Sequence, residues 1–157
     1  QHALETARVI NAINPDFIRL RTLHVVPGTD LDELMNKGEF KPLTDDDILR
    51  EIKLFIENLD VRGTYLASDH ILNLLEELEG NLPDDRQNML AAIEKYFKLS
   101  AEDRLVFRLG RRSGSLRKLD DLADQATYGR LRSVVDHYAA RGENLDEDII
   151  KMMNNFI

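Results

Sequence analysis

The hydrophobic and polar positions of residues 17–24 follow the period of a strand, and the composition of residues 63–68 predicts a second short strand. Residues 17–24 alternate with a period of two, so that successive side chains point to opposite faces. Residues 63–68 are rich in residues that favour strands and lie between a helix end and a helix start. Because helical sequence separates the two segments, we expect a parallel pair joined by a right-handed crossover.

Helical periodicity dominates the rest of the chain. The clearest helix starts at Thr44, where Thr44-Asp45-Asp46-Asp47 resembles a capping box and an apolar residue recurs on each following turn. Ser100 opens a second box, and its helix runs to a Gly- and Ser-containing break at 110–115. Further helices are predicted at residues 2–12, 31–36, 71–79, 83–97, 116–126, 130–141 and 145–156. The expected fold class is therefore α/β and mainly helical, with a small parallel sheet of about two strands followed by C-terminal helices.

Two arginines lie on the same face of the first predicted strand. Arg19 and Arg21 are separated by one residue, so both point to one side of a regular strand. If helices cover both faces, the guanidiniums need carboxylates, carbonyls or a bound anion to offset the loss of water. A ligand cavity lined by these arginines fits the pattern, and structural pairing with Asp16 or Asp69 is the alternative.

The motifs around this strand resemble those of a known enzyme superfamily. They are Asn14 to Leu23, the Pro27-Gly28-Thr29 turn, the Gly38-Glu39-Phe40 loop, the Leu43-Thr44 helix start and Ser68-Asp69-His70-Ile71-Leu72-Asn73-Leu74-Leu75. Together they resemble a region late in the barrel of radical S-adenosylmethionine enzymes, in the branch of the oxygen-independent coproporphyrinogen oxidases and the elongator-like proteins. The resemblance weakens after Leu82 and ends near Lys118.

The chain departs from that superfamily in having no cysteine. The Cys-x3-Cys-x2-Cys cluster motif is absent, and iron–sulfur clusters are normally held by cysteine thiolates. The resemblance therefore implies the C-terminal part of a larger enzyme, which alone is not catalytic. Residues 1–80 would close a partial (β/α) barrel, with residues 81–157 as a helical extension packed on it as one unit. S-adenosylmethionine and a four-iron four-sulfur cluster are implied for the parent protein, and no cofactor for this chain by itself.

Candidate cofactor- or substrate-binding residues lie where the two strands end, because barrel enzymes place their sites at the carboxyl ends of their strands. Asp69 beside His70 suits acid–base work or substrate orientation. The alternative is a helix start, with Ser68 or Asp69 as the cap and His70 exposed. No metal site is expected, because no His, Asp and Glu set has ligand spacing. The candidates are Arg19, Arg21, Thr22, Ser68, Asp69 and His70.

A basic run without acids stands out in this acidic chain. Its members are Arg104, Arg108, Arg111, Arg112, Arg117 and Lys118. Such a run can hold RNA phosphates, but we favour a charged face that pairs with Glu102, Asp120 and Asp121. The net charge of −8 also argues against attraction of the whole surface to nucleic acid or anionic membranes.

Composition and chain length complete the sequence-based expectations. With 43% hydrophobic and 32% charged residues and no apolar run of spanning length, we expect a cytoplasmic protein without a membrane partner. The expected partners are the N-terminal remainder of the parent chain and, because a sheet cut from a barrel has unpaired edges, a second copy. The competing interpretation is a non-catalytic helical adaptor that binds protein or RNA.

Overall fold

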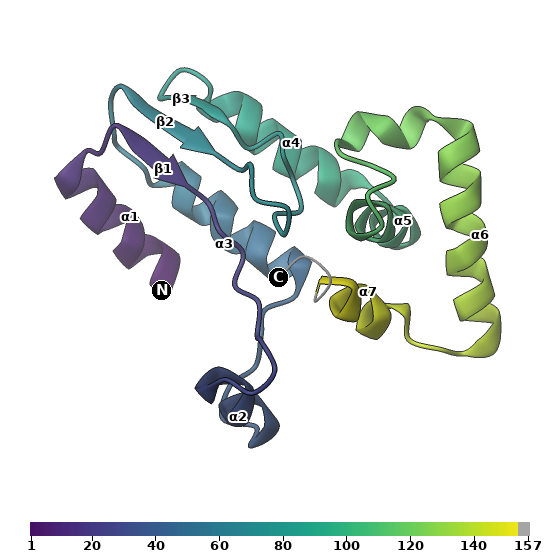
Figure 1. Cartoon of the computed structure of the whole chain (residues 1–157). Coiled ribbons are helices and arrows are strands. Elements are labelled where there is room, and N and C mark those ends of the chain that lie inside the picture. The colour runs from purple at the N-terminus through teal and green to yellow at the C-terminus, as the bar shows by residue number, and fades with distance from the viewer. Residues whose placement is uncertain (154–157) are drawn as a thin grey trace.

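The computed structural model describes residues 1–153, which form a small sheet surrounded by helices (Figure 1). The helices are α1 (His2–Ile13), α2 (Asp30–Asn36), α3 (Asp45–Glu57), α4 (Arg86–Lys98), α5 (Ala101–Arg112), α6 (Gln125–Arg141) and α7 (Leu145–Met153), with a 3₁₀ helix, η1 (Leu119–Ala123). The strands are β1 (Phe17–Arg19), β2 (Thr64–Ala67) and β3 (Gly80–Leu82). The predicted fold class, mainly helical with a small sheet, is confirmed.

The sheet has the strand order β1-β2-β3. The predicted parallel pairing of β1 with β2 is confirmed, and Phe17 lies opposite Tyr65 and Arg19 opposite Ala67. The third strand was not predicted, and it pairs antiparallel with β2. A glycine starts β3 and the strand has three residues, so its sequence carries little strand signal.

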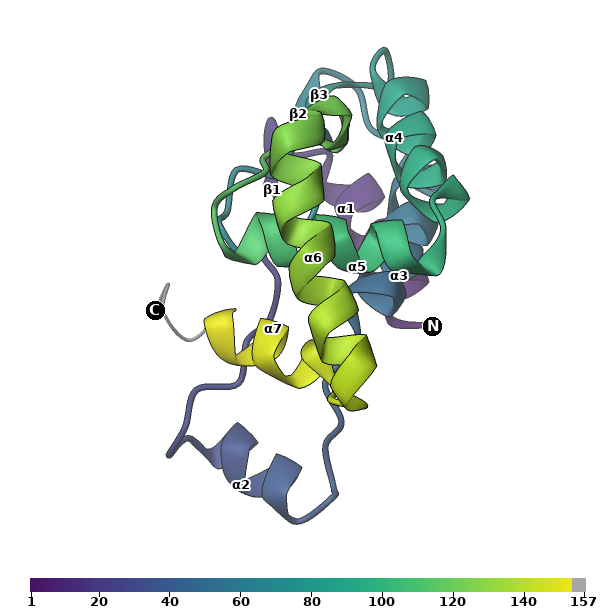
Figure 2. The ribbon, with the colours of Figure 1, turned by 90° about the vertical axis from the view of Figure 1, so that its right-hand side faces the viewer.

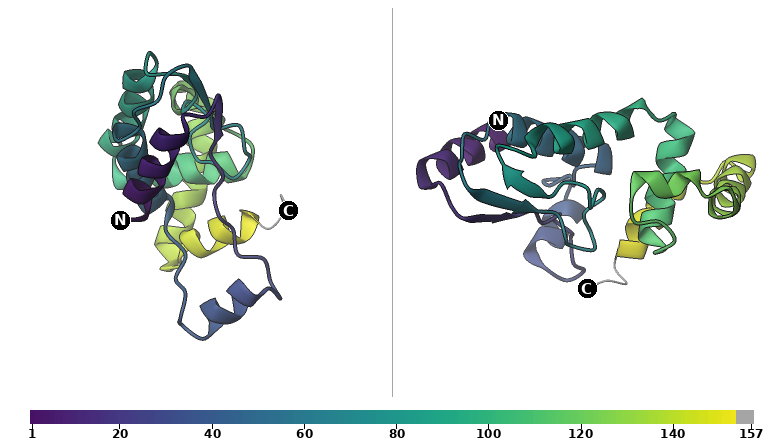
Figure 3. Two further views of the ribbon diagram at one scale, coloured as in Figure 1. Left: turned by 90° about the vertical axis from the view of Figure 1, so that its left-hand side faces the viewer. Right: turned by 90° about the horizontal axis from the view of Figure 1, so that it is seen from above.

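Helices cover only one face of this sheet. Helices α1, α3 and α4 lie on that face, and no helix of residues 1–153 covers the other (Figures 1 and 3). Ile18 and Leu66 point into the core and are buried. Phe17 and Tyr65 point the opposite way, remain 53% and 37% exposed, and stack with their ring centroids 6.0 Å apart. The sheet therefore has one core face and one open face.

The predicted helix starts are confirmed by their caps. The Thr44 hydroxyl accepts a hydrogen bond from the Asp47 amide at 3.2 Å, and the Ser100 hydroxyl accepts one from the Asp103 amide at 3.0 Å. These bonds satisfy amide donors that have no partner within the helix. The helices predicted at 2–12, 31–36, 83–97 and 130–141 also form, with shifted ends. Part of the predicted helix at 145–156 forms α7, and its remainder lies outside the described residues.

Two predicted helices are wrong in whole or in part. Residues 71–79 form an irregular loop, although their leucines have helical spacing. The carbonyls of Leu72, Asn73 and Leu74 accept hydrogen bonds from arginine side chains of α5, and these contacts hold the segment as a loop. The helix predicted at 116–126 is reduced to η1, because Asp124 accepts a hydrogen bond from the Ala126 amide at 3.0 Å and starts α6 instead.

The C-terminal helices α5, α6 and α7 lie at one end of the body that is formed by the sheet and helices α1, α3 and α4 (Figure 1). Helix α6 crosses α5, and α7 packs beside α5 (Figure 2). One cluster of buried side chains includes Leu66 of the sheet, Phe107 of α5 and Val135 of α6.

Helix α2 projects from the body on two long connections (Figures 1 and 2). We call the helix with its two connections, residues 20–44, the α2 arm. None of the described helices combines the length and the apolar character needed to cross a membrane.

Candidate functional site

The carboxyl ends of β1 and β2 lie side by side because the two strands are parallel neighbours. Arg19 ends β1 and Asp69 follows β2, and the two side chains form a bidentate ion pair. Arg19 Nε donates to Asp69 Oδ1 at 2.7 Å and Nη2 donates to Oδ2 at 2.6 Å. Both side chains stay about half exposed, at 45% and 47%. Arg19 therefore has a fixed orientation on the open face, and its Nη1 donors are not used by this pair.

The charges at this strand end influence one another. The hydrogen bond from Arg19 lowers the pKa of Asp69 and the same bond raises the pKa of Arg19. His70 is partly buried, and its burial together with the positive charges of Arg21 and Arg19 lowers its pKa. His70 is thus neutral near pH 7, with one nitrogen able to accept a proton or a hydrogen bond.

Arg21 does not lie on the strand with Arg19. The strand β1 ends at Arg19, so the prediction of a strand at 17–24 that carries both arginines is wrong in its length. β2 ends opposite Arg19 at Ala67, and the Leu20 amide makes the last ladder bond, to Ala67 O at 2.9 Å. Beyond that point no neighbouring backbone is available, and Arg21 is exposed.

A side-chain amide takes the place of the missing neighbouring backbone. Asn73 Nδ2 donates to Leu20 O at 3.1 Å, and Asn73 Oδ1 accepts from both the amide and the hydroxyl of Thr22, each at 3.0 Å. A peptide group of an adjacent strand would make the same pair of contacts. Asn73 Nδ2 also donates to Ser68 Oγ at 3.1 Å, so this buried residue joins the ends of both strands.

Ser68, Asp69 and His70 do not form the predicted helix start. The Ser68 hydroxyl donates to Leu75 O at 2.7 Å and is buried, and Asp69 binds Arg19 as described above. His70 is only partly exposed, and its Nδ1 atom is buried without a hydrogen-bond partner among the described residues. The capping interpretation of these three residues is therefore wrong, because the chain after β2 turns back as a loop.

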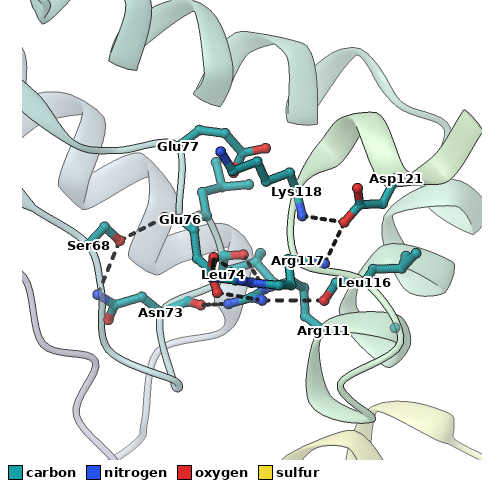
Figure 4. Close-up of polar contacts among 12 residues, drawn as sticks. Ser68, Asn73, Leu74, Glu76, Glu77, Arg111, Leu116, Arg117, Lys118 and Asp121 are labelled. Atoms are coloured by element: carbon teal, nitrogen blue, oxygen red, sulfur yellow. Dashed lines mark hydrogen bonds and ion pairs between the residues drawn. The ribbon is translucent and has the colours of Figure 1, made fainter.

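The loop after β2 is held from the other side by Arg111 at the end of α5 (Figure 4). Its guanidinium donates to Leu74 O at 2.9 Å, to Asn73 O at 3.0 Å and to Leu116 O at 3.3 Å. It also binds Glu76 Oε1 at 3.0 Å and is only 3% exposed. Burial lowers the pKa of Arg111, and the Glu76 carboxylate opposes that shift.

Arg112 extends the same contact by one residue. It donates to Leu72 O at 2.9 Å and to Asp45 Oδ1 at 2.8 Å, and it is 2% exposed. Three consecutive carbonyls of the loop, from Leu72 to Leu74, thus accept hydrogen bonds from two neighbouring arginines of α5. The site loop has its shape because buried cations replace the amides that a helix would supply.

The basic run is therefore not one exposed face. Its two central members are buried, and the other arginines pair with acids on other elements. The acids that pair with the run are Asp45, Asp46, Glu76 and Asp146. The prediction that Glu102, Asp120 and Asp121 pair with the side chains of this run is wrong. Asp121 instead accepts hydrogen bonds from the backbone amides of Arg117 and Lys118.

The site offers oriented hydrogen-bond donors and one neutral histidine. An arginine held by a carboxylate can bind a second anion with its remaining donors. An iron–sulfur cluster does not fit the residues of this chain, since it has no cysteine thiolate. Among the described residues, no three His, Asp or Glu side chains are grouped closely enough to hold a metal ion.

Sequence reasoning found Arg19, Thr22, Ser68 and Asp69 as neighbours but missed what holds them in place. Asn73 is not among the candidate site residues, and Arg111 was predicted to belong to a charged, solvated face. Only one signal pointed to its burial: Arg111 follows the apolar residues Val106, Phe107 and Leu109 of an amphipathic helix at helical spacing. Comparison with protein families, curated proteins and solved structures gives no match.

Proposed function

We propose that this chain is the closing part of a radical S-adenosylmethionine barrel enzyme and that it supplies contacts to cofactor or substrate. The observation that carries this proposal is the Arg19–Asp69 pair at the carboxyl ends of two parallel strands. In a (β/α) barrel, helices cover the outer face of the strands and the site lies at their carboxyl ends. In this sheet, too, helices cover one face and the other face is open (Figure 3), which supports the comparison with a barrel strand pair.

The residues on the open face support the same assignment. Phe17, Arg19 and Tyr65 share this face, which would line the barrel interior. β1 is an edge strand among the described residues, so its free edge can pair with a preceding strand of the parent. The cluster of the parent enzyme would be held by cysteines outside this chain, and the chain itself would contribute binding and orientation.

The sharpest test uses the parent protein. Its gene is expected to encode Cys-x3-Cys-x2-Cys upstream of Gln1, and the protein reconstituted anaerobically with iron and sulfide is expected to cleave S-adenosylmethionine. Arg19→Lys is expected to weaken binding of the cofactor or an anionic substrate by about 1.5–3 kcal/mol, because an ammonium cannot form the oriented fork. Arg62→Lys is the matched control, since Arg62 is exposed just before the amino end of β2.

Two results would overturn this assignment. A parent gene without the three-cysteine motif would exclude the enzyme and leave the adaptor interpretation. Unchanged binding in a folded Arg19→Lys protein would make the Arg19–Asp69 pair purely structural.

For the isolated chain, the free edge of β1 and the open face of the sheet favour a dimer. Sedimentation equilibrium that gives only an 18.1 kDa species would contradict this expectation.

A further inference from the structure

A cleft of about 410 Å³ opens between the two connections of the α2 arm and the first turns of α3. Residues 20–23 form one wall, residues 40–43 form another, and α3 contributes Ile48 and Ile52. The volume lies in the range of small-molecule sites, which run from about 300 to 1,000 Å³. Leu20, one residue beyond Arg19, lines the cleft, whereas Arg19 does not. The cleft thus adjoins the strand-end site: Thr22 and Asn73 are part of its lining, whereas Arg19 and Asp69 lie outside it.

The walls of the cleft are mainly apolar. Leu20, Phe40, Ile48 and Ile52 are partly buried there, and Leu43 is 52% exposed. Covering such side chains with an apolar group is favourable, at about 25 cal/mol for each Å² removed from water. The cleft thus presents apolar surface that the described residues leave open to a ligand.

The charges of the cleft favour an anion. Arg21 and Lys41 both line it, and neither forms an ion pair with any residue of the described part of the chain. The acid in the lining is Glu51, whose carboxylate contacts His2 Nδ1 at 3.4 Å. A ligand anion can therefore pair with both cations, although the chain as a whole has a net charge of −8.

We propose that this cleft binds a small organic anion, with a carboxylate on an apolar body. The carboxylate lies between Arg21 and Lys41, and the apolar body packs on Ile48, Ile52 and Leu20. Such a ligand would also contact both connections of the α2 arm and so fix the arm relative to α3. This site goes beyond the proposed function, and it can be tested on this chain without the parent protein or its cofactors.

The test is a methyl NMR titration of the chain with octanoate below its micelle concentration. Octanoate is expected to shift the methyl signals of Ile48 and Ile52, while octylammonium and 1-octanol bind at least about tenfold more weakly because they lack the anionic group. Arg21→Gln and Lys41→Gln are each expected to lower the affinity about tenfold or more. Lys37→Gln is the matched control, because Lys37 lies on the same arm, pairs with Glu33 and does not line the cleft.

Each result decides the proposal. Selective octanoate shifts in the cleft that weaken in both cleft variants but not in the control support it. Equal binding of the three probes, shifts confined to other residues, an unaltered affinity in the folded Arg21 and Lys41 variants, or no binding of octanoate overturns it. The Arg19→Lys substitution in the parent protein tests the Arg19–Asp69 pair separately, because Arg19 does not line the cleft.

Discussion

Arg111 and Arg117 bind the same carboxylate at very different depths, and this provides a matched test of the loop's support. Arg111 is 3% exposed and binds Glu76 Oε1, whereas the Arg117 side chain is 77% exposed and binds Glu76 Oε2, both at 3.0 Å. Methionine keeps most of the apolar stem of arginine and removes its charge and donors. The substitutions Arg111→Met and Arg117→Met therefore differ in burial and in the hydrogen bonds lost.

The expected magnitudes follow from those hydrogen bonds. Arg111→Met leaves the buried carbonyls of Asn73, Leu74 and Leu116 without this donor, and an unsatisfied buried group costs about 1–3 kcal/mol. Removing one partner of a buried pair costs about 3–5 kcal/mol in all, and we expect that loss in the free energy of unfolding. Arg117→Met removes an exposed pair, which contributes about 0–1 kcal/mol. A protein of this size has about 5–15 kcal/mol in total, so the first loss is a large fraction.

Urea denaturation followed by far-UV circular dichroism measures both losses, with the slope of the transition checked for each variant. Amide hydrogen exchange of residues 71–79 adds a local measurement, and protection there is expected to fall in Arg111→Met only. The reasoning is refuted if the two variants lose the same stability, or if Arg111→Met loses less than about 1 kcal/mol with an unchanged slope.

Two further predictions concern α5 and its neighbours. Gly110→Ala is expected to destabilise the fold by about 1–2 kcal/mol, because a Cβ there would lie 2.4 Å from Leu116 Cδ1. At the exposed Gly129, an added Cβ meets no atom within 4 Å, so Gly129→Ala is expected to stabilise α6 by up to about 1 kcal/mol. Thermal unfolding that ranks the two variants in the opposite order would contradict this reasoning. Hydrogen bonds from Tyr128 and then Ser100 lower the pKa of Asp103, so this carboxylate contributes stability above its unfolded pKa of about 3.9 that is lost as pH falls through the lower folded value. Tyr128→Phe is expected to raise the Asp103 pKa toward 3.9 in a carboxyl NMR titration, and an unchanged pKa would contradict the assignment.

Local sequence signals predicted the elements whose contacts are local. Thr44 caps α3 through a residue three positions away. Alternation predicted β1, and strand-favouring residues between two helical segments predicted β2. Of the two acids named as alternative partners for the arginines, Asp16 and Asp69, the structure pairs Asp69 with Arg19, 50 residues away in the chain. These features depend on periodicity and capping, which a single sequence contains.

The features that sequence reasoning missed depend on distant partners. Residues 71–79 have the leucine spacing of a helix, but the carbonyls of Leu72, Asn73 and Leu74 bind arginines nearly 40 residues later. Tertiary contacts of this kind override helix propensity, which amounts to less than about 1 kcal/mol for each ordinary residue. A pair of arginines at a helix end has the same local pattern whether it is solvated or buried, so Arg111 and Arg112 could not be recognised from their neighbours.

The C-terminal helices influence the candidate site through one chain of contacts. Arg111 holds the carbonyl of Asn73, and the side chain of Asn73 holds Thr22 and Ser68 at the ends of the two parallel strands. Because each of these groups is buried or partly buried, the loop after β2 cannot move without breaking hydrogen bonds to α5. The α2 arm on the other side has no buried residue in its helix. The arm that carries Arg21 is therefore held by fewer buried groups than the loop after β2, and we expect its amides to exchange faster than those of residues 71–79.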